Sequence, residues 1–204
     1  MTRDDVPGAA SGGRDRLERL WTPYRLAYIQ SDEREKNPDP FMSIPDMSDE
    51  DGLIVARGDS VYAVMNKFPY NPGHLLIVPY RKVAQFEDVT ATELAELMDF
   101  ARAAVKVIKL VSNPDAMNIG FNIGRASGGS VGDHLHLHIV PRWIGDANFM
   151  TVIDATKVLA QALGQTRHLL ASEWASHDWA PGTAIPGDMP TYGVGESSSG
   201  DVDA

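Results

Sequence analysis

The feature that most constrains this chain is the stretch His134–Pro141, which reads HLHLHIVP. Three histidines alternate there with branched apolar residues. Successive side chains of a β-strand point to opposite faces, so the alternation predicts a strand with its leucines toward a core. His134, His136 and His138 then form a row on the other face. A strand with an ordinary polar outer face explains the leucines but gives no reason for three histidines.

Length and composition indicate a globular protein. A chain of 204 residues with 43% hydrophobic residues is long enough for one sizeable packed domain. It contains no cysteine, which excludes disulfides, thiolate zinc sites and a cysteine nucleophile, and fits a cytoplasmic protein. No apolar signal core or membrane-length run is present, so we expect no membrane partner. The net charge of −10 argues against nucleic acid as a partner.

The sequence predicts one folded domain with two loose ends. Residues 1–13 are small and polar and read as a disordered N-terminal tail, and residues 178–204 read as an acidic disordered C-terminal tail. The domain between them, residues 14–177, begins with a helical extension over residues 14–29. Residues 31–51 carry several prolines and are expected to cross the surface, with Phe41 as an anchor.

The order of predicted elements indicates an α+β fold. A helix opens at the Thr90–Glu93 capping box and ends before Asn113-Pro114, and a second long helix covers residues 157–174. Strands are predicted over residues 53–56, 61–66, 74–79, 117–123 and 134–143. Several strands follow one another without a helix between them, which favours an antiparallel sheet with the helices packed on one face.

The histidine row suits two kinds of chemistry. A neutral imidazole is a nucleophile and a proton carrier near neutral pH. The glycine- and serine-rich loop over residues 124–133 leads directly into the row and offers backbone N–H groups to an anion. Together they predict a phosphate held by amides and attacked by a histidine. The alternative is a zinc-binding protein that uses His74, His134, His136 and His138 as ligands.

Three separate stretches resemble the histidine triad (HIT) superfamily. The first is the triad stretch His134–Val140. The second, Asn71–Pro79, resembles the proline-glycine-histidine strand of that family and follows Asn66. The third is Asn122-Ile123-Gly124, before the glycine loop. The resemblance spans residues 55–143 and implies a single domain of the HIT-like fold that acts on the phosphate attached to a nucleoside.

The resemblance implies a role for each histidine. His136 would be the nucleophile and would form a covalent nucleotidyl-histidine. His134 would orient it, and His138 would contact the reacting phosphate. His74 would lie near the same phosphate or the leaving group.

The resemblance also implies nucleotide-binding residues. Asn66 and Leu76 would contact the ribose and base, while Asn122, Gly129 and Ser130 would bind phosphate oxygens. No cofactor would be required.

Within the superfamily, the stretches Pro141–Trp143, Gly145–Phe149 and Leu20–Arg25 resemble actinobacterial diadenosine tetraphosphate phosphorylases of the fragile-histidine-triad-like branch. These use inorganic phosphate as co-substrate. Hydrolase relatives carry a glutamine near Ser130, and this chain has none over residues 122–138. Phosphorolysis is therefore favoured over hydrolysis of a dinucleoside polyphosphate or a nucleoside phosphoramidate. Trp143 would close over the phosphates or merely pack at the strand end.

Other readings stay open at this point. A nucleotide-sensing module without turnover is one, although an intact nucleophile position argues against it. The family resemblance implies a homodimer or a homotetramer. His168 and His177 are read as surface histidines with no catalytic role.

Overall fold

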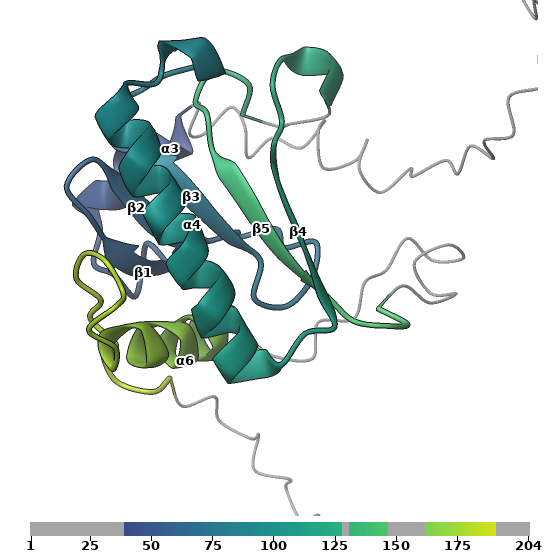
Figure 1. Cartoon of the computed structure of the whole chain (residues 1–204). Coiled ribbons are helices and arrows are strands. Elements are labelled where there is room, and N and C mark those ends of the chain that lie inside the picture. Colours follow the sequence, from purple (N-terminus) through teal and green to yellow (C-terminus); the bar gives the residue numbers. More distant parts are fainter. Residues whose placement is uncertain (1–38, 128–130, 147–161, 191–204) are drawn as a thin grey trace, which may run out of the picture.

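The computed structural model describes residues 39–127, 131–146 and 162–190, and its centre is a five-stranded sheet in the order β1-β2-β3-β5-β4 (Figure 1). Every neighbouring pair of strands is antiparallel. The strands are β1 Ile54–Arg57, β2 Val61–Met65, β3 Leu75–Pro79, β4 Ala116–Phe121 and β5 Leu137–Arg142. Single 3₁₀ turns lie at Phe86–Asp88 and Arg125–Ser127. The antiparallel α+β fold predicted from the sequence is confirmed.

Two helices, α4 (Ala91–Ser112) and α6 (Leu163–Ala175), cover one face of the sheet (Figure 1). They bury residues of β1, β2, β3 and β5, such as Ala63 and Ile139, against Phe100 and Trp174, and Met117 and Phe121 of β4 pack partly against the same core. Removing one such large apolar side chain from water stabilises the fold by roughly 1.5–3 kcal/mol. The predicted capping box is confirmed at the start of α4, and Asn113 ends that helix in the left-handed conformation.

The other face of the sheet is covered by a short segment made of α3 (Pro40–Ser43) and a 3₁₀ turn at Ile44–Asp46. Phe41 of α3 is buried against the alternate residues of β2 and β3, including Val64 and Leu76. The hydroxyl of Tyr62 donates to the carbonyl of Phe41 over 2.8 Å. The predicted anchoring role of Phe41 is therefore confirmed, and it fixes this segment against the face that carries the histidines.

The histidine-rich strand begins later than predicted. The sequence predicts strand over residues 134–143, whereas β5 starts at Leu137. In the register of β3 and β5, Ile77 faces Leu137, so Leu135 would face Pro79. Proline has no N–H to continue the ladder. The Pro79 carbonyl instead faces the His134 side chain, and Leu135 N–H donates to Val83.

The prediction of disorder from residue 178 is wrong for residues 178–190. There Thr183 forms a bridge with Arg57 of β1, and the Trp174 indole donates to Pro181. Gly182 has a φ of +72°, and a Cβ at this position would lie 2.3 Å from the Arg57 carbonyl. Glycine is thus what lets the chain approach β1, although the acidic, proline- and glycine-rich composition is typical of a tail.

Several predictions fall outside the described residues. These are the disordered tail over residues 1–13, the helix over 14–29, the start of the helix predicted over 157–174, and the tail beyond residue 190. Within the described part of the chain, no helix is long and apolar enough to cross a membrane.

Candidate active site

Four histidines gather on the face of the sheet that carries α3. His138 lies on β5, His134 and His136 lie just before it, and His74 lies just before β3. All four are buried, with exposed fractions of 0% to 8%. His74 and His138, which are 64 residues apart in sequence, meet with Nε2 and Nδ1 at 2.9 Å. The structure therefore brings together the four histidines that the sequence singled out.

The protons of His74 and His138 can be assigned from their neighbours. The Tyr70 backbone N–H donates to Nδ1 of His74 over 3.1 Å, and the Asn66 amide lies 3.4 Å from the same atom. Nδ1 of His74 is thus an acceptor, and Nε2 carries the proton that it donates to His138. His138 then carries its own proton on Nε2, which lies 3.1 Å from the side-chain amide of Asn122. The Asn122 atom at this distance is the amide nitrogen Nδ2, so the assigned tautomer requires the amide to turn its oxygen toward Nε2.

Burial keeps His74 neutral. Burial of the His74 ring, reinforced by the neighbouring His138 and His136, lowers the pKa of His74 to about 3. The result is a directed chain from the Tyr70 backbone through His74 to His138. It presents an N–H donor at the position of Asn122.

His136 carries its proton on Nδ1, whereas His74 and His138 carry theirs on Nε2. Its Nδ1 donates to the backbone carbonyl of His134 over 2.9 Å, so in the neutral ring Nε2 is the nitrogen with a lone pair. Burial lowers the pKa of His136, and the neighbouring His134 lowers it further, against the hydrogen bond that raises it. The ring lies 4.8 Å from the His138 ring, centroid to centroid. A neutral imidazole with a basic nitrogen thus sits beside an N–H donor.

Two aromatic rings enclose the histidines, and sequence reasoning missed both contacts. Tyr70 stacks on His138 with centroids 5.8 Å apart and an interplanar angle of 9°. Phe41 lies 4.8 Å from the His136 ring. Tyr70 directly precedes the Asn71-Pro72-Gly73-His74 motif, which is the one signal in the sequence that points to it.

A second buried polar group fixes the loop before His74. The Asn71 side chain, 2% exposed, donates to the Pro141 carbonyl over 2.8 Å and to Asp146 over 2.6 Å. Arg142 and Asn71 both lower the pKa of the Asp146 carboxyl, Arg142 more strongly. The half-buried Trp143 donates its backbone N–H to the same carboxylate. These bonds tie the loop between β2 and β3 to the turn after β5.

The remaining predicted residues divide into three groups. Leu76 pairs with His138 across the β3–β5 ladder and is buried. Asn66 and Asn122 each contact a histidine, as given above. Gly129 and Ser130 lie outside the described residues.

The zinc alternative finds no ligand set in the described residues, 39–127, 131–146 and 162–190. Among them, no three His, Asp or Glu side chains are grouped as a metal ion requires. Most of the nitrogens of the four histidines lie instead toward one another, toward backbone groups, or toward the side chains of Asp39 and Asn122.

Comparison with known proteins agrees with this geometry. Residues 48–143 match the family described as HIT domain. A protein named AP-4-A phosphorylase from Mycobacterium tuberculosis is 54% identical over 171 residues, which cover 80% of this chain and 88% of that protein. An asymmetrical bis(5'-nucleosyl)-tetraphosphatase from Schizosaccharomyces pombe is 40% identical over 128 residues, covering 63% of this chain and 70% of that protein.

The fold is also similar to a solved structure. A hypothetical histidine triad nucleotide-binding protein from Sulfolobus tokodaii superposes with a TM-score of 0.54 at 26% identity, over 66% of this chain and 91% of that chain. The sequence matches, the antiparallel sheet and the four grouped histidines agree with one another: this chain belongs to the histidine triad family.

Proposed function

We propose that this protein cleaves diadenosine tetraphosphate by phosphorolysis, giving ADP and ATP through a covalent nucleotidyl-histidine on His136. The observation that carries the proposal is the hydrogen bond from His136 Nδ1 to the His134 carbonyl, because it leaves Nε2 as the nucleophilic atom. The 54% identity to a protein named AP-4-A phosphorylase supports this substrate.

The first half-reaction transfers an adenylyl group to the enzyme. The Nε2 lone pair of His136 attacks the α-phosphorus, the bond from that phosphorus to the bridging oxygen breaks, and ATP leaves. His138 Nε2–H donates to the reacting phosphate or to the departing oxygen, and Asn122 orients it. His74 acts as a positioning residue for His138, and His134 does so for His136.

In the second half-reaction, an oxygen of inorganic phosphate attacks the phosphorus of the adduct. The bond to Nε2 breaks, ADP forms and the neutral imidazole is restored. Positioning and charge stabilisation supply most of the rate in such transfers. The backbone amides of the loop over residues 124–133 would stabilise the phosphate oxygens, with Gly129 and Ser130 as contacts and Asn66 and Leu76 at the nucleoside. Trp143 would close over the phosphates.

The choice between phosphate and water as acceptor rests on Ser130. No glutamine lies in residues 122–138 to serve a hydrolytic step, and a serine hydroxyl offers a donor to phosphate. The test is to incubate the protein with diadenosine tetraphosphate, with and without phosphate, and to identify the products. ADP and ATP formed only with phosphate support phosphorolysis, whereas AMP and ATP would identify a hydrolase. Activity that is lost with a strong chelator and restored by zinc would favour the metal alternative.

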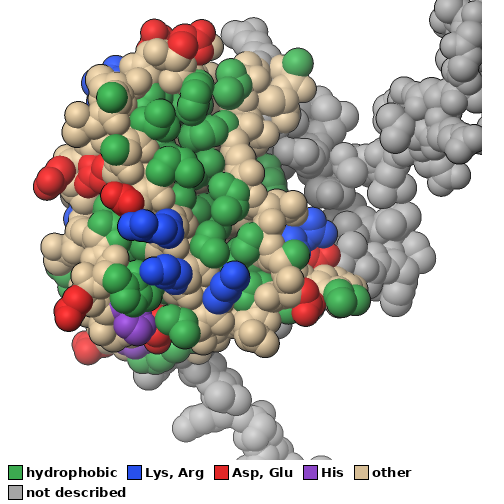
Figure 2. All heavy atoms as spheres, in the orientation of Figure 1, with side chains coloured by type: hydrophobic (Ala, Val, Ile, Leu, Met, Phe, Trp, Pro, Cys, Tyr) green, Lys and Arg blue, Asp and Glu red, His purple; other side chains and the backbone are tan. Residues whose placement is uncertain are grey.

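We further propose that the protein is a homodimer. Figure 2 shows hydrophobic side chains gathered on the face that carries α4 and the edge strand β4. Met98 of α4 and Ile119 of β4 are 52% and 50% exposed, and an edge strand has main-chain groups open to pairing. Sedimentation analysis should show a dimer that Met98→Glu weakens. Met42→Glu, which adds the same charge on α3 at the opposite face, should leave it intact.

A further inference from the structure

A charged cluster lies beside His134 and involves a residue that precedes the HIT match over residues 48–143. Asp39, immediately before α3, has Oδ1 at 3.6 Å from Nδ1 of His134. Its other oxygen, Oδ2, accepts from Lys82 over 2.6 Å, and Lys82 also lies 2.9 Å from Asp133. Three segments therefore meet at this first histidine of the row: the residue before α3, the loop after β3 and the approach to β5.

The surroundings of the His134 ring specify its protons. The ring is fully buried, and Nε2 lies 2.9 Å from the Pro79 carbonyl. A carbonyl only accepts, so Nε2 carries a proton. Nδ1 is also buried, and among the described residues it has no hydrogen-bond partner. The group beside it is the Asp39 carboxylate at ion-pair distance. A lone pair on Nδ1 would face that negative charge, whereas an N–H would be attracted to it.

Lys82 joins the carboxylate beside His134 to a second carboxylate. Lys82 hydrogen-bonds to the carboxylates of both Asp39 and Asp133, which raises the pKa of the ammonium. The other groups around the His134 ring are Phe41, whose ring it meets edge-on at 5.6 Å, His136 and the carboxylate of Asp133.

We propose that Asp39 is a positioning residue that, together with Lys82, holds His134 as an oriented imidazolium and through it fixes the nucleophile His136. The link to His136 is the His134 carbonyl, which accepts from His136 Nδ1. A positive ring at position 134 also opposes protonation of His136, so it preserves the lone pair that attacks. The role of Asp39 rests on the proposed function in one respect, the assignment of the attack to His136.

The first test reads the protons directly. The full chain is labelled with ¹⁵N in its histidines and studied by NMR at pH 7.5, where an imidazolium and a neutral ring have distinct nitrogen shifts. His134 should show the imidazolium pattern, and Asp39→Asn should convert it to a neutral pattern. Asp133→Asn removes the same charge from the other partner of Lys82, whose charge interaction with His134 is the weakest of the influences on the pKa of the Asp133 carboxyl, and it should keep more of the imidazolium than Asp39→Asn does. A neutral His134 in the unaltered protein would overturn the proposal.

The second test reads the chemistry. In single-turnover experiments with diadenosine tetraphosphate, Asp39→Asn should slow formation of the His136 adduct by about ten- to a hundredfold with little change in KM. Asp39→Glu should restore part of the rate. An adduct that forms at the full rate in Asp39→Asn defeats the role of Asp39 while the proposed function stands. An imidazolium at His134 without any adduct in the unaltered protein defeats the function while the Asp39–His134 pair stands.

A third variant covers the case in which Asp39→Asn fails to fold. Lys82→Met leaves Asp39 in place but removes the ammonium that pairs with its carboxylate. The Lys82 side chain is 43% exposed, so we expect the fold to tolerate this change. We expect a lower imidazolium population at His134 and a slower adduct step. An unchanged NMR pattern would count against the proposal.

Discussion

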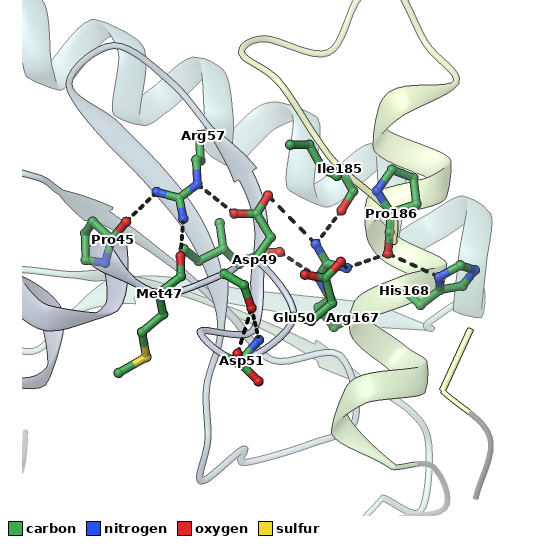
Figure 3. Close-up of polar contacts among 12 residues, drawn as sticks. Pro45, Met47, Asp49, Glu50, Asp51, Arg57, Arg167, His168, Ile185 and Pro186 are labelled. Carbon is green, nitrogen blue, oxygen red and sulfur yellow. Dashed lines mark hydrogen bonds and ion pairs between the residues drawn. The ribbon is translucent and has the colours of Figure 1, made fainter. Parts of the chain in front are cut away.

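Two buried polar clusters of this protein solve the same physical problem in different ways. The histidine cluster, made of His74, His134, His136 and His138, lies on the α3 face of the sheet. The arginine cluster, made of Arg57, Arg167 and Asp49, joins β1, α6 and the segment before β1 (Figure 3). Both bury polar groups, the four histidines in one and Arg167 and Asp49 in the other, and burial costs free energy unless each group has a partner.

The arginine cluster satisfies its charges with backbone carbonyls. Arg167, 2% exposed, donates to Ile54 of β1 over 2.7 Å and also to Ile185 and Pro186 (Figure 3). Arg57 donates to Pro45 and Met47 in the same manner, over 3.0 and 3.1 Å. Each arginine thus holds in place a chain segment that forms no β-strand of its own. This cluster serves the architecture, since its donors are committed to fixed carbonyls.

The histidine cluster is directional instead. Its hydrogen bonds run from the Tyr70 backbone to His74 and on to His138, and from His136 to the His134 carbonyl. They specify which nitrogen carries each proton, and they place the lone pair of His136 and the donor of His138 on two rings whose centroids are 4.8 Å apart. Burial of polar groups alone therefore does not identify an active site. What distinguishes the site is a bonding pattern that specifies which ring nitrogen is a donor and which has a lone pair.

Removal of the nucleophile should have the largest effect on turnover. His136→Gln should lower turnover of diadenosine tetraphosphate by on the order of 10³ or more, because Nε2 forms the covalent bond. The free energy of unfolding should change by less than about 2 kcal/mol, since one hydrogen bond is lost. Steady-state kinetics and chemical denaturation check the two halves. Full turnover in this variant would end the assignment of His136.

The matching change in the arginine cluster should lower the free energy of unfolding and leave turnover unchanged. Arg167→Met leaves the Asp49 carboxylate buried without this partner and frees three backbone carbonyls. We expect a loss of about 3–5 kcal/mol in the free energy of unfolding, with turnover kept below the melting temperature. Arg102→Met, at a 70% exposed side chain on α4, is the control and should cost less than about 0.5 kcal/mol. Equal effects of the two variants would contradict the structural role of Arg167.

The third prediction concerns pH. The pKa of His74 is about 3 in the fold, against its ordinary value of 6.5. Between these values the unfolded chain binds a proton that the folded protein does not, so stability falls as pH falls. This one group should remove about 2 kcal/mol between pH 6.5 and 4.5. Denaturation curves across that range should be shallower in their pH dependence for His74→Gln. An equal pH dependence in both proteins would show that His74 already binds the proton when folded.

Much of the fold could be predicted because it follows from local patterns. The capping box at Thr90 starts α4, and the alternation around Leu137 and Ile139 gives the buried strand. The gathering of His74 with His138 depends on a contact between residues 64 positions apart. It was accessible only through the family resemblance, because periodicity says nothing of which strands become neighbours.

The contacts that escaped prediction have physical reasons of their own. Asp39 and Phe41 lie in a proline-rich segment that reads as a surface crossing, and only the three-dimensional structure shows that it covers the histidines. The segment over residues 178–190 has the composition of a tail. Its order comes from Thr183, which pairs with β1, and from carbonyls that the distant Arg167 binds. Composition cannot reveal a partner that is supplied by another element.

The smallest expected effect on turnover and stability concerns a histidine that lies in the arginine cluster. His168 of α6 is half-buried beside Arg167 (Figure 3), and its Nδ1 lies 3.2 Å from the same Pro186 carbonyl that Arg167 binds. If location rather than residue type decides function, His168→Ala should leave turnover unchanged and cost about 1 kcal/mol of stability, the worth of one hydrogen bond. Ser172→Ala removes only the hydroxyl 3.4 Å from the far side of the ring and should cost less still. Kinetics and denaturation measured side by side test this, and a tenfold loss of turnover in His168→Ala would mean that the two clusters are coupled rather than separate.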